Sequence, residues 1–259
     1  MDATGRVIVV TGGARGIGRA LANRFASAGA EAVVVADIDL DGATEVAKSI
    51  RGSAIQCDVS RESDVEQLVD KVQQEHGRID IFCSNAGIAV AGGPEAPTDQ
   101  WQRIWDVNLM SHVFVARHVL PAMLARGEGY ILGTVSAAGL LNHVFAAPYG
   151  VTKAAALSLF EWLSIAHGEQ GIRISCLCPQ GVKTEMLAAE RREGLEFLTE
   201  GALEPAAVAE IVLQGLRDER FLILPHPEVA EYFRRKAGDY DRWLKGMRRL
   251  RANILSASS

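Results

Sequence analysis

The sequence predicts a doubly wound α/β fold, a seven-stranded parallel sheet with helices on both faces, and two observations predict it. Seven short runs rich in valine and isoleucine recur along the 259 residues, and segments long enough for helices lie between them. Strands joined by helical crossovers pair in parallel, and near-continuous apolar strands are typical of a sheet covered on both faces. No internal repeat or linker rich in Pro, Gly or Ser divides the chain, so a single domain over residues 1–259 fits this length.

The expected strands and helices alternate in order. From the Val/Ile-rich runs, strands are predicted at residues 6–11, 32–37, 53–57, 79–84, 129–135, 172–178 and 221–224. The longer segments predict helices at residues 16–28, 40–50, 61–76, 98–126, 149–169 and 205–218. We further expect a substrate loop or helix near residues 183–204 and a helical tail near residues 226–250.

Composition and charge exclude several classes of protein. With 48% hydrophobic, 23% charged and 6% aromatic residues, the chain is neither disordered nor fibrous. It has no secretory signal and no uninterrupted apolar run of roughly 18 to 20 residues, so we expect a cytoplasmic protein without a membrane partner. Residues 226–259 carry eight Lys/Arg and four Asp/Glu, against a net charge of −5 overall. Because aromatic and aliphatic residues alternate with these charges at helical spacing, a packed amphipathic helix is favoured over a nucleic-acid-binding arm.

Cysteine and histidine spacing indicates neither disulfides nor a metal site. Cys57, Cys83, Cys176 and Cys178 are too few and scattered for a disulfide framework, and alternation puts the last two on one face of their strand. The six histidines form no pairs at ligand spacing, with each other or with the cysteines. We therefore expect reduced structural thiols and no structural or catalytic metal.

The first strand and the helix after it enclose a glycine-rich turn. The strand runs directly into Thr11-Gly12-Gly13-Ala14-Arg15-Gly16-Ile17-Gly18. A dinucleotide pyrophosphate binds backbone N–H groups at a helix N-terminus, and glycines let the main chain approach it closely. Gly12, Gly16 and Gly18, with Arg15 and Ile17 between them, therefore predict a Rossmann cofactor site, although their G-x-x-x-G-x-G spacing departs from G-x-G-x-x-G.

The end of the second strand indicates which nicotinamide cofactor binds. Asp37 lies 19 residues after Gly18, where the ribose-binding carboxylate of a nucleotide fold is expected. It would bind the adenosine 2′-OH and repel a 2′-phosphate, whereas Arg15 could pair with that phosphate. In a poorly screened cleft, the repulsion of a 2′-phosphate by the fixed Asp37 carboxylate should exceed its attraction to Arg15, so NAD is expected. Asp37 could instead be a helix N-cap, a role that Asp39 or Asp41 could also fill.

The third and fourth strands also end in polar motifs at the same sheet edge. Asp58 and Val59 follow the third strand, where a carboxylate and a backbone N–H can meet an adenine. Asn85, Ala86 and Gly87 follow the fourth strand, beside the point where strand order should reverse. These three residues are therefore expected to border the nicotinamide ribose.

Tyr149 and Lys153 open the helix after the fifth strand, and their four-residue spacing puts phenol and ammonium on one helix face. Tyrosine, with a pKa near ~10, is a poor base at neutral pH, but a nearby ammonium and a nicotinium cation stabilise its phenolate. The pair therefore predicts a general base for an alcohol proton. Tyr232 and Lys236 repeat this spacing within the basic tail.

Context favours the first pair over the second. Ser136 terminates the fifth strand, 13 residues before Tyr149, and ligands of open α/β sheets bind at the carboxyl ends of the strands. No hydroxyl-rich strand end precedes Tyr232. We therefore expect Ser136 beside the substrate oxygen and Tyr149 as the base.

Taken together, these motifs resemble the short-chain dehydrogenase/reductase family over roughly residues 5–225. The resemblance rests on residues 11–18, Asp37, residues 85–87, Asn108, Ser136, Tyr149 and Lys153. It implies an Asn-Ser-Tyr-Lys tetrad in which Asn108 holds a water that links Lys153 to solvent. Lys153 would also hold the nicotinamide ribose, and hydride would pass from an alcohol to NAD.

The chain departs from the family in two places. Gln180 stands between Pro179 and Gly181, where Pro-Gly directly is usual. We expect it to reshape the loop over the nicotinamide, with Val182 and Thr184 still placed to meet the carboxamide. The tail from Pro225 onward is longer and more basic than in a minimal member.

The loops expected around the substrate are mostly apolar. They are residues 88–90, 138–145 and 186–187, with Leu140, Asn142, His143 and Met186 as candidate substrate contacts. Lys183 is the only cation near them, so a carboxylate or phosphate substrate lacks a partner. An uncharged hydrophobic secondary alcohol, alicyclic, terpenoid or steroid-like, is favoured. An NADPH-dependent ketoreductase and a non-catalytic dinucleotide-sensing protein are the alternatives.

The two longest helices predict self-association. Apolar residues cover more of them than one sheet face can bury: Val107, Met110, Phe114, Val115 and Val119, then Leu157, Phe160, Leu163 and Ile165. A leftover apolar surface marks an interface, and the resemblance implies homodimers or homotetramers built by pairing these helices about two-fold axes. The tail, with Tyr232, Phe233, Trp243 and Leu244, would cover the substrate cleft, dock on a neighbouring subunit or pack on its own chain.

Overall fold

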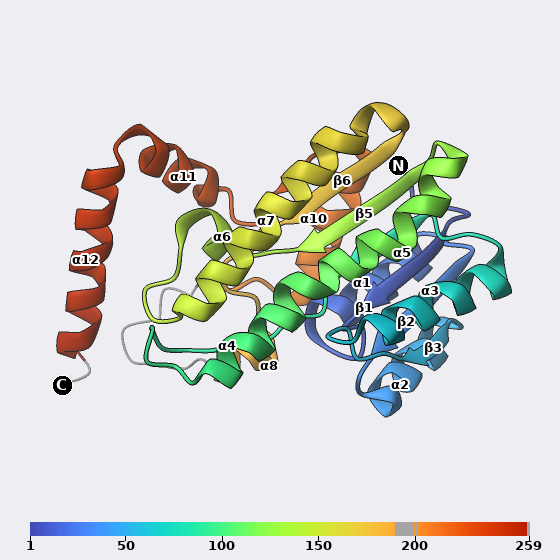
Figure 1. Ribbon diagram of the computed structural model, residues 1–259, viewed down its shortest axis with the longest axis horizontal. Helices are drawn as coiled ribbons and strands as arrows, with labels where there is room; N and C mark the ends of the chain where they lie inside the picture. Colours follow the sequence, from blue (N-terminus) through green and yellow to red (C-terminus); the bar gives the residue numbers. More distant parts are fainter. Residues whose placement is uncertain (190–198, 200, 258–259) are drawn as a thin grey trace.

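A seven-stranded parallel sheet forms the centre of the protein, as predicted (Figure 1). The computed structural model describes residues 1–189, 199 and 201–257, so part of the expected 183–204 substrate segment lies outside the described residues. The sheet order is β3-β2-β1-β4-β5-β6-β7. The strands are β1 (Val7–Thr11), β2 (Ala32–Asp37), β3 (Ser53–Gln56), β4 (Ile81–Ser84), β5 (Gly129–Thr134), β6 (Ile172–Leu177) and β7 (Leu222–Ile223). Strand order reverses between β1 and β4, the position where ligands of doubly wound sheets bind.

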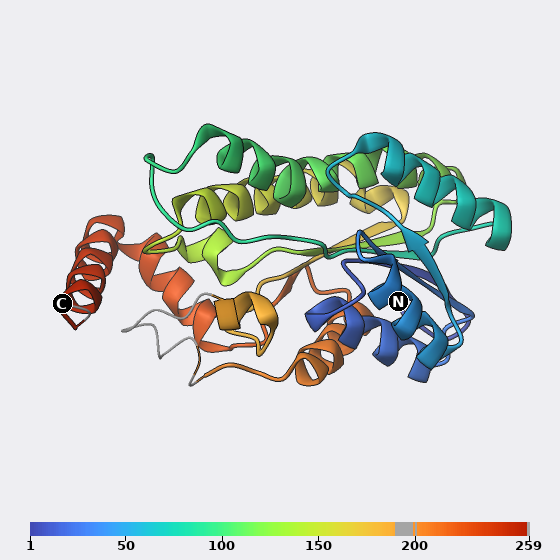
Figure 2. The same cartoon turned by 90° about the horizontal axis from the view of Figure 1, so that it is seen from below.

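Two layers of helices cover the sheet (Figure 2). One layer contains α3 (Glu62–His76), α5 (Ser111–Arg126) and α7 (Ala147–His167), and the other contains α1 (Gly16–Ser27), α2 (Leu40–Ile50) and α10 (Pro205–Arg217). Alternate residues of each central strand enter the two cores, so Val7 and Val9 face the first layer while Ile8 and Val10 face the second. This burial on both faces explains the near-continuous apolar runs.

The predicted helix at 98–126 is in fact three segments. They are α4 (Thr98–Trp105), a π-helical turn (Asp106–Met110) and α5. The π turn carries Asn108, which is fully buried. π-Bulges insert one residue per turn and often mark functional sites, so this irregularity changes the direction in which Asn108 points without ending the helix.

The same stretch, Thr98–Arg126, is long and apolar enough to cross a membrane when length and composition alone are considered. Half of the apolar stretch that meets this criterion is buried in the protein. Val115 and Val119 pack into the sheet core. This burial is what a core helix of a globular protein shows.

Within the described residues, a short helix was not predicted, and the two tail helices were predicted as one. The unpredicted helix is α6 (Ala137–Leu141), and α8 (Glu185–Ala189) begins the expected substrate segment. The expected single tail helix is two, α11 (Glu228–Gly238) and α12 (Tyr240–Ala257). Asp239 separates them because its backbone is extended and its carboxylate accepts a hydrogen bond from Arg242 N, 2.9 Å away, which caps α12.

The cysteines are buried structural groups. Cys176 and Cys178 enter the same core cluster, as alternation predicted. Burial raises the pKa of Cys57 and Cys178 to about 12. Thiols held in the neutral form by desolvation are poor nucleophiles.

Part of the predicted surplus of apolar helix surface is buried. Val115, Val119, Leu157, Phe160 and Leu163 all belong to the core. Ile165 is instead strongly exposed, and the sequence analysis did not select its exposed companions on α7, Trp162 and Val151.

Candidate active site

The glycine turn between β1 and α1 is shaped for a close backbone approach. Gly12 and Gly16 have φ values of +64° and +53°, in the left-handed region. A Cβ on Gly18 would lie 2.0 Å from Gly12 O, and a Cβ on Gly12 would lie 2.8 Å from Ala86 Cα. Only glycine fits these three positions. The turn opens the N-terminus of α1 toward the cleft, so it fits the pyrophosphate of a dinucleotide.

Asn85 ties three strand ends together at this turn. Its Nδ2 donates to Thr11 O at 2.9 Å and Gly12 O at 3.3 Å, and its Oδ1 accepts from Thr134 Oγ1 at 2.9 Å. Asn85 N donates to Thr11 Oγ1 at 3.0 Å. Asn85 therefore fixes the glycine turn relative to β4 and β5. Thr11, quoted only as part of the glycine-turn motif, and Thr134 were assigned no role from the sequence, although both are hydroxyl residues at strand ends.

Asp37, at the end of β2, is buried against the turn. Its Oδ2 accepts a hydrogen bond from Ala14 N and its Oδ1 accepts one from Asp39 N, both at 3.0 Å. The alternative role as N-cap of α2 belongs to Asp39, which accepts from Gly42 N at 3.0 Å. Asp37 is therefore a fixed negative charge beside the glycine turn.

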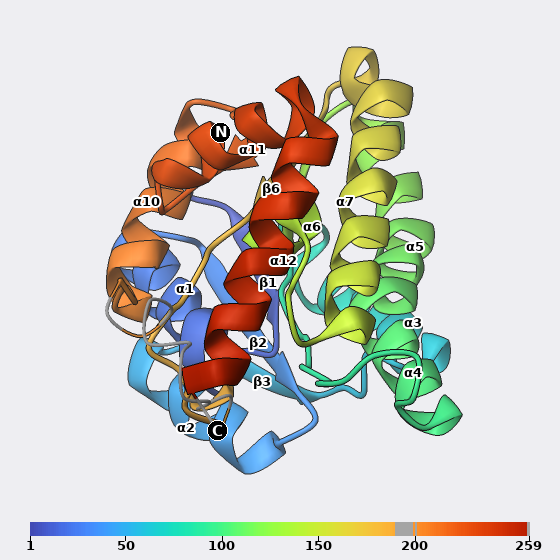
Figure 3. The ribbon, with the colours of Figure 1, turned by 90° about the vertical axis from the view of Figure 1, so that its left-hand side faces the viewer.

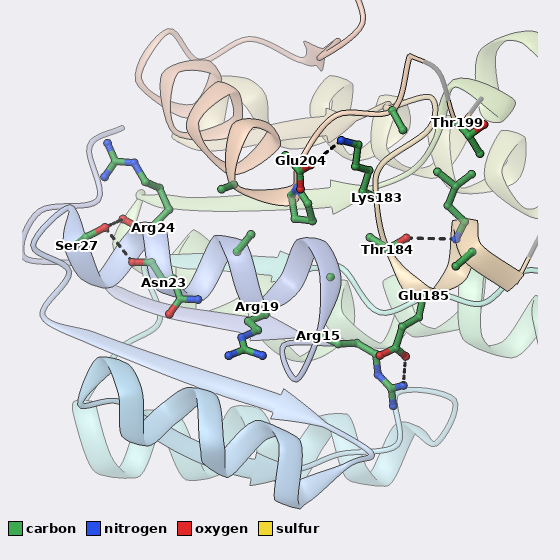
Figure 4. A pocket seen from close by; sticks show the side chains of 17 residues that line it. Arg15, Arg19, Asn23, Arg24, Ser27, Lys183, Thr184, Glu185, Thr199 and Glu204 are labelled. Atoms are coloured by element: carbon green, nitrogen blue, oxygen red, sulfur yellow. Dashed lines mark hydrogen bonds and ion pairs between the residues drawn. The ribbon is translucent and has the colours of Figure 1, made fainter. Parts of the chain in front are cut away.

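Arg15 is paired with carboxylates in this structure. Its guanidinium lies 2.7 Å from Glu185 Oε2 on α8 and 3.7 Å from Asp39 Oδ2. Figure 4 shows the Arg15–Glu185 pair beside a groove between α1 and the segment that follows β6. Lys183 at this groove pairs with Glu204 at 2.7 Å. These cations are thus already neutralised by acids.

Asp58 and Val59 also reach the cleft, after β3. Asp58 Oδ1 accepts hydrogen bonds from Ser60 N at 3.0 Å and from Ser60 Oγ at 2.7 Å, while Asp58 N donates to Asp64 Oδ2 at 3.2 Å. The loop is therefore held in one conformation at the sheet edge. Ile38, which follows Asp37 and is 61% exposed, also lines the cleft.

Lys153 and Tyr149 lie together at the N-terminal part of α7. Lys153 is buried, and its Nζ donates to Thr134 O at 2.9 Å and lies 5.7 Å from the centroid of the Tyr149 ring. Desolvation by burial lowers the pKa of Lys153 to about 8. Ser136 Oγ accepts a hydrogen bond from Ala138 N at 3.0 Å and so caps α6. All three side chains line one cleft.

Asn108 lies directly behind this group. Its Nδ2 donates to Ile88 O and its Oδ1 accepts from Ile88 N, both at 2.9 Å. A Cβ on Gly87 would be 3.3 Å from both Asn108 Oδ1 and Lys153 Nζ. The two side chains therefore flank Gly87, which lines the same cleft as Ser136 and Tyr149.

A cleft of about 1170 Å³ joins these features, except that the fully buried Asn108 is not among its described lining residues. Every cofactor-binding residue expected from the sequence lines it: Gly12, Arg15, Gly16, Ile17, Gly18, Asp37, Asp58, Val59, Asn85, Ala86, Gly87, Tyr149, Lys153, Val182 and Thr184. Of the expected substrate contacts, Ser136, Asn142, His143 and Met186 line it too. Leu140 does not, because its side chain is buried in the core; Leu141 takes its place in the lining.

The cations near the substrate region differ from the expectation. Lys183 is not among the described lining residues of the cleft and bonds to Glu204 instead. Arg103 of α4 and Arg235 of α11 line the cleft, and Arg235 Nε donates to Glu231 Oε1 at 2.9 Å. The sequence analysis considered only the loops after the strands, so it overlooked both.

The C-terminal helices reach the cleft, one of the three positions expected for the tail, with Tyr232 and Trp243 but not Phe233 or Leu244 among the described lining residues. Tyr232, Trp243, Met247 and Leu250 line the same cleft. The last three lie at positions i, i+4 and i+7, a spacing that marks one helix face. Tyr232 thus reaches the cleft, but Lys236 Nζ turns away from it to bond Leu140 O and lies 5.4 Å from the centroid of the Tyr240 ring. The second Tyr-Lys pair is therefore not arranged like the first.

The loop with the extra Gln180 is held by a buried histidine. Gln180 N donates to His226 Nδ1 at 3.1 Å, and Gly201 O lies 3.2 Å from His226 Nε2. The first bond requires an unprotonated Nδ1, so Nε2 carries the proton and donates to Gly201. His226 is 4% exposed. It joins the loop after β6 to the start of the tail.

The parallel sheet, the glycine turn at its switch point and the Ser-Tyr-Lys group beside it define a dinucleotide-dependent oxidoreductase. The family model described as "short chain dehydrogenase" matches residues 6–194. The chain therefore belongs to the short-chain dehydrogenase/reductase family, as the motifs had indicated.

Relatives that act on alcohols match most of the chain. The meso-2,3-butanediol dehydrogenase of Serratia marcescens is 36% identical, over 80% of this chain and 85% of its own. The 1-deoxy-11-beta-hydroxypentalenate dehydrogenase of Streptomyces exfoliatus is 34% identical, over 86% and 84%. A family member from Burkholderia phymatum, solved in complex with NAD, superimposes with a TM-score of 0.84 at 29% identity, over 93% and 96%.

Proposed function

We propose that this enzyme is an NAD-dependent dehydrogenase that converts an uncharged hydrophobic secondary alcohol to a ketone, or catalyses the reverse. The observation that carries the proposal is the position of Lys153. Its buried ammonium lies beside the Tyr149 ring, at the carboxyl edge of the sheet and within reach of the glycine turn. A cation in that place stabilises a phenolate and so makes tyrosine a usable base.

The described side chains divide the work as follows. A bound nicotinamide supplies the hydride acceptor. Tyr149 removes the hydroxyl proton of the alcohol, and Lys153 stabilises the resulting phenolate. Because Ser136 Oγ already accepts a hydrogen bond from Ala138 N, its own hydrogen is available to donate to the substrate oxygen. Asn108, fixed on both sides by Ile88, would hold the water that leads protons away from Lys153.

Asp37 and Arg15 support NAD over NADP. Asp37 is fixed by two backbone N–H groups beside the turn, where its charge opposes a 2′-phosphate. Arg15 would have to leave Glu185 and Asp39 to pair with that phosphate. The NADPH-dependent ketoreductase alternative depends on such an exchange. The Burkholderia phymatum relative, which holds NAD, is consistent with the first assignment.

The walls of the cleft support an apolar substrate. Ile88, Leu141, Val144 and Met186 line the cleft together with Ser136 and Tyr149, and Arg235, a cation of the same lining, is paired with Glu231. Burial of apolar substrate surface there is worth roughly 25 cal/mol per Å². The named relatives act on hydroxyl compounds of different kinds. They therefore support the type of reaction and do not identify the particular alcohol.

A spectrophotometric screen tests this function. Purified protein is mixed with NAD and a panel of alicyclic, terpenoid and steroid alcohols, and NADH absorbance is recorded. Tyr149→Phe should lower the rate by roughly 10² to 10⁴-fold, while the affinity for NADH, measured by fluorescence, stays within about threefold. Tyr240→Phe, a change on the exposed tail, serves as the matched control.

Two results would contradict the proposal. Full activity of Tyr149→Phe would remove the assigned base. NADH binding without oxidation of any alcohol, or reduction of any ketone, would support the dinucleotide-sensing alternative.

A further inference from the structure

The C-terminal helices lie across the open end of the candidate active site. Figure 3 shows α12 in front of the carboxyl edge of the sheet, between the layer of α1 and α10 and the layer of α5 and α7. Figure 1 shows α11 and α12 outside the two layers that cover the sheet. Their placement therefore serves a purpose other than covering the central strands.

Polar contacts attach these helices to α6 and to the loop between α6 and α7. Lys236 Nζ donates to Leu140 O at 2.5 Å. Arg251 Nε donates to Val144 O at 3.2 Å, and its guanidinium carbon lies 5.3 Å from the centroid of the Phe145 ring. These contacts join residues about a hundred positions apart in the sequence. The loop they hold leads directly to Tyr149.

Apolar packing reinforces the attachment. Ile254 and Leu250 of α12 form a separate small cluster with Phe145 and Val144. On its other side the same loop is bonded to Gly92, whose N donates to Phe145 O at 2.8 Å. The loop is therefore held between the tail and the segment that follows β4, and neither contact alone fixes it.

One face of the tail remains directed into the cleft. Tyr232, Trp243, Met247 and Leu250 are partly buried lining residues of the cleft that contains Ser136 and Tyr149. Leu244, adjacent to Trp243 in the sequence, is 43% exposed. The apolar side chains of α12 that line the cleft are therefore different from Leu244, which faces solvent.

We propose that α11 and α12 form the outer wall of the alcohol site, with Trp243 and Met247 as specificity-determining residues for a bulky, polycyclic apolar alcohol. Lys236 and Arg251 act as positioning residues that hold the wall on the loop before Tyr149. The proposal rests on the proposed dehydrogenase function, and it names the size of substrate that this site selects. Tyr149, Trp243 and Met247 line the same cleft, and a fused-ring alcohol has more apolar surface to bury against this wall than a four-carbon diol has.

A graded series of alcohols tests the wall. The series is 2,3-butanediol, cyclohexanol, decahydro-2-naphthol and androsterone, each assayed with NAD. For the parent enzyme, KM should fall along the series. Trp243→Ala should raise KM for the two largest alcohols at least about tenfold and change it less than about twofold for the smallest, because only large substrates lose contact area. Leu244→Ala, on the exposed side of the same helix, is the matched control.

A binding measurement separates this proposal from the proposed function. Trp101, Trp105 and Trp162 are not among the described lining residues, whereas Trp243 is. The ketone of the largest substrate should quench the tryptophan fluorescence of the parent enzyme, and this quenching should be lost in Trp243→Phe; that result supports the wall. Quenching of this kind without oxidation of any alcohol would overturn the dehydrogenase function and leave the wall supported. If the alcohols are oxidised but Trp243→Ala changes KM equally at every substrate size, or does not change KM at all, only the wall is overturned. If the ketone does not quench the fluorescence and no alcohol is oxidised, both proposals are overturned.

The positioning residues have their own readout. Arg251→Ala should lower kcat for every alcohol about three- to tenfold and leave NADH affinity unchanged, because the loop before Tyr149 loses its outer support. Arg251→Lys retains a cation and should recover part of the loss. Arg249→Ala, on the opposite side of α12, is the control. An unchanged kcat in Arg251→Ala would remove the positioning role.

Discussion

Asp37 connects the choice of cofactor to the conformation of the glycine turn. Both of its carboxylate oxygens accept backbone hydrogen bonds, one from Ala14 within the turn and one from Asp39. Removing the carboxylate therefore leaves a buried N–H without its acceptor, which costs about 1 to 3 kcal/mol. A test of cofactor preference has to separate the loss of charge from the loss of this acceptor.

Two substitutions at Asp37 make that separation. The parent enzyme should have a much higher kcat/KM with NAD than with NADP. Asp37→Asn, which keeps one acceptor oxygen but no charge, should shift the ratio toward NADP by roughly tenfold or more, because repulsion of the 2′-phosphate is lost. Asp37→Ala should shift the ratio similarly and also lower the melting temperature. Equal efficiency of the parent with both cofactors would overturn the weight given to this residue.

Lys153 contributes a second effect, on stability. Its ammonium is buried, and desolvation holds its pKa at about 8, compared with 10.5 in the unfolded chain. Between these two pH values the unfolded state binds more protons than the folded state, so the free energy of unfolding contributed by this residue rises with pH. Below pH 8 the folded protein carries the full cost of burying the charge.

The cofactor-free enzyme should show this cost in comparison with Lys153→Met. The free energy of unfolding, measured in urea, should rise in the parent relative to the variant by up to about 3 kcal/mol between pH 7 and 10.5. The difference between the two proteins isolates Lys153 from the buried thiols, which also affect stability at alkaline pH. A difference that is constant with pH would show that burial does not depress the pKa.

At the scale of elements, the sequence predicts well what local pattern decides. The seven strands and the main helices follow from apolar runs that bury both sheet faces, and their outer ends lie at most two residues from the expected ones. Asp37 and Ser136 were assigned from their place at strand ends. Asn108 followed only from the family resemblance, because nothing local distinguishes a π turn from an ordinary helix interruption.

What the sequence could not predict depends on contacts between distant segments. The bonds of Lys236 to Leu140 and of Arg251 to Val144 join residues with no shared local pattern. The spacing of Trp243, Met247 and Leu250 indicated an amphipathic helix, but not which surface its apolar face meets. His226 was likewise an unassigned histidine until the fold placed it beside Gln180.

The loop after β6 yields a prediction at this scale. His226→Phe keeps a buried ring but removes both ring nitrogens, so Gln180 N and Gly201 O lose their partners. We expect a loss of stability of roughly 1 to 3 kcal/mol and a several-fold weaker NADH affinity, since Val182 and Thr184 follow this loop. Thermal unfolding and NADH fluorescence titration measure the two effects. Unchanged NADH affinity would show that His226 supports the tail alone.

At the scale of the whole molecule, α7 carries an apolar face that the described part of the chain leaves exposed. Val151, Trp162 and Ile165 are 44%, 60% and 82% exposed. Separations of 11 and 14 residues from Val151 put all three within about 60° around the helix axis. Leu157, Phe160 and Leu163 occupy the opposite, sheet-facing side. The exposed stripe is therefore distinct from the surface that stabilises the fold.

We expect a second copy of the chain to cover this stripe. Pairing of two such stripes would form the homodimer or homotetramer that the family resemblance implies. A two-fold axis lets one patch pair with itself, and burying Trp162 and Ile165 on both subunits removes their apolar surface from water. Light scattering at micromolar concentration should therefore give at least twice the 27.9 kDa chain mass. Ile165→Glu should shift the mass toward the monomer, because two carboxylates would meet near the axis, whereas Leu244→Glu on α12 should not. A monomer mass for the parent would mean that α7 is exposed in solution.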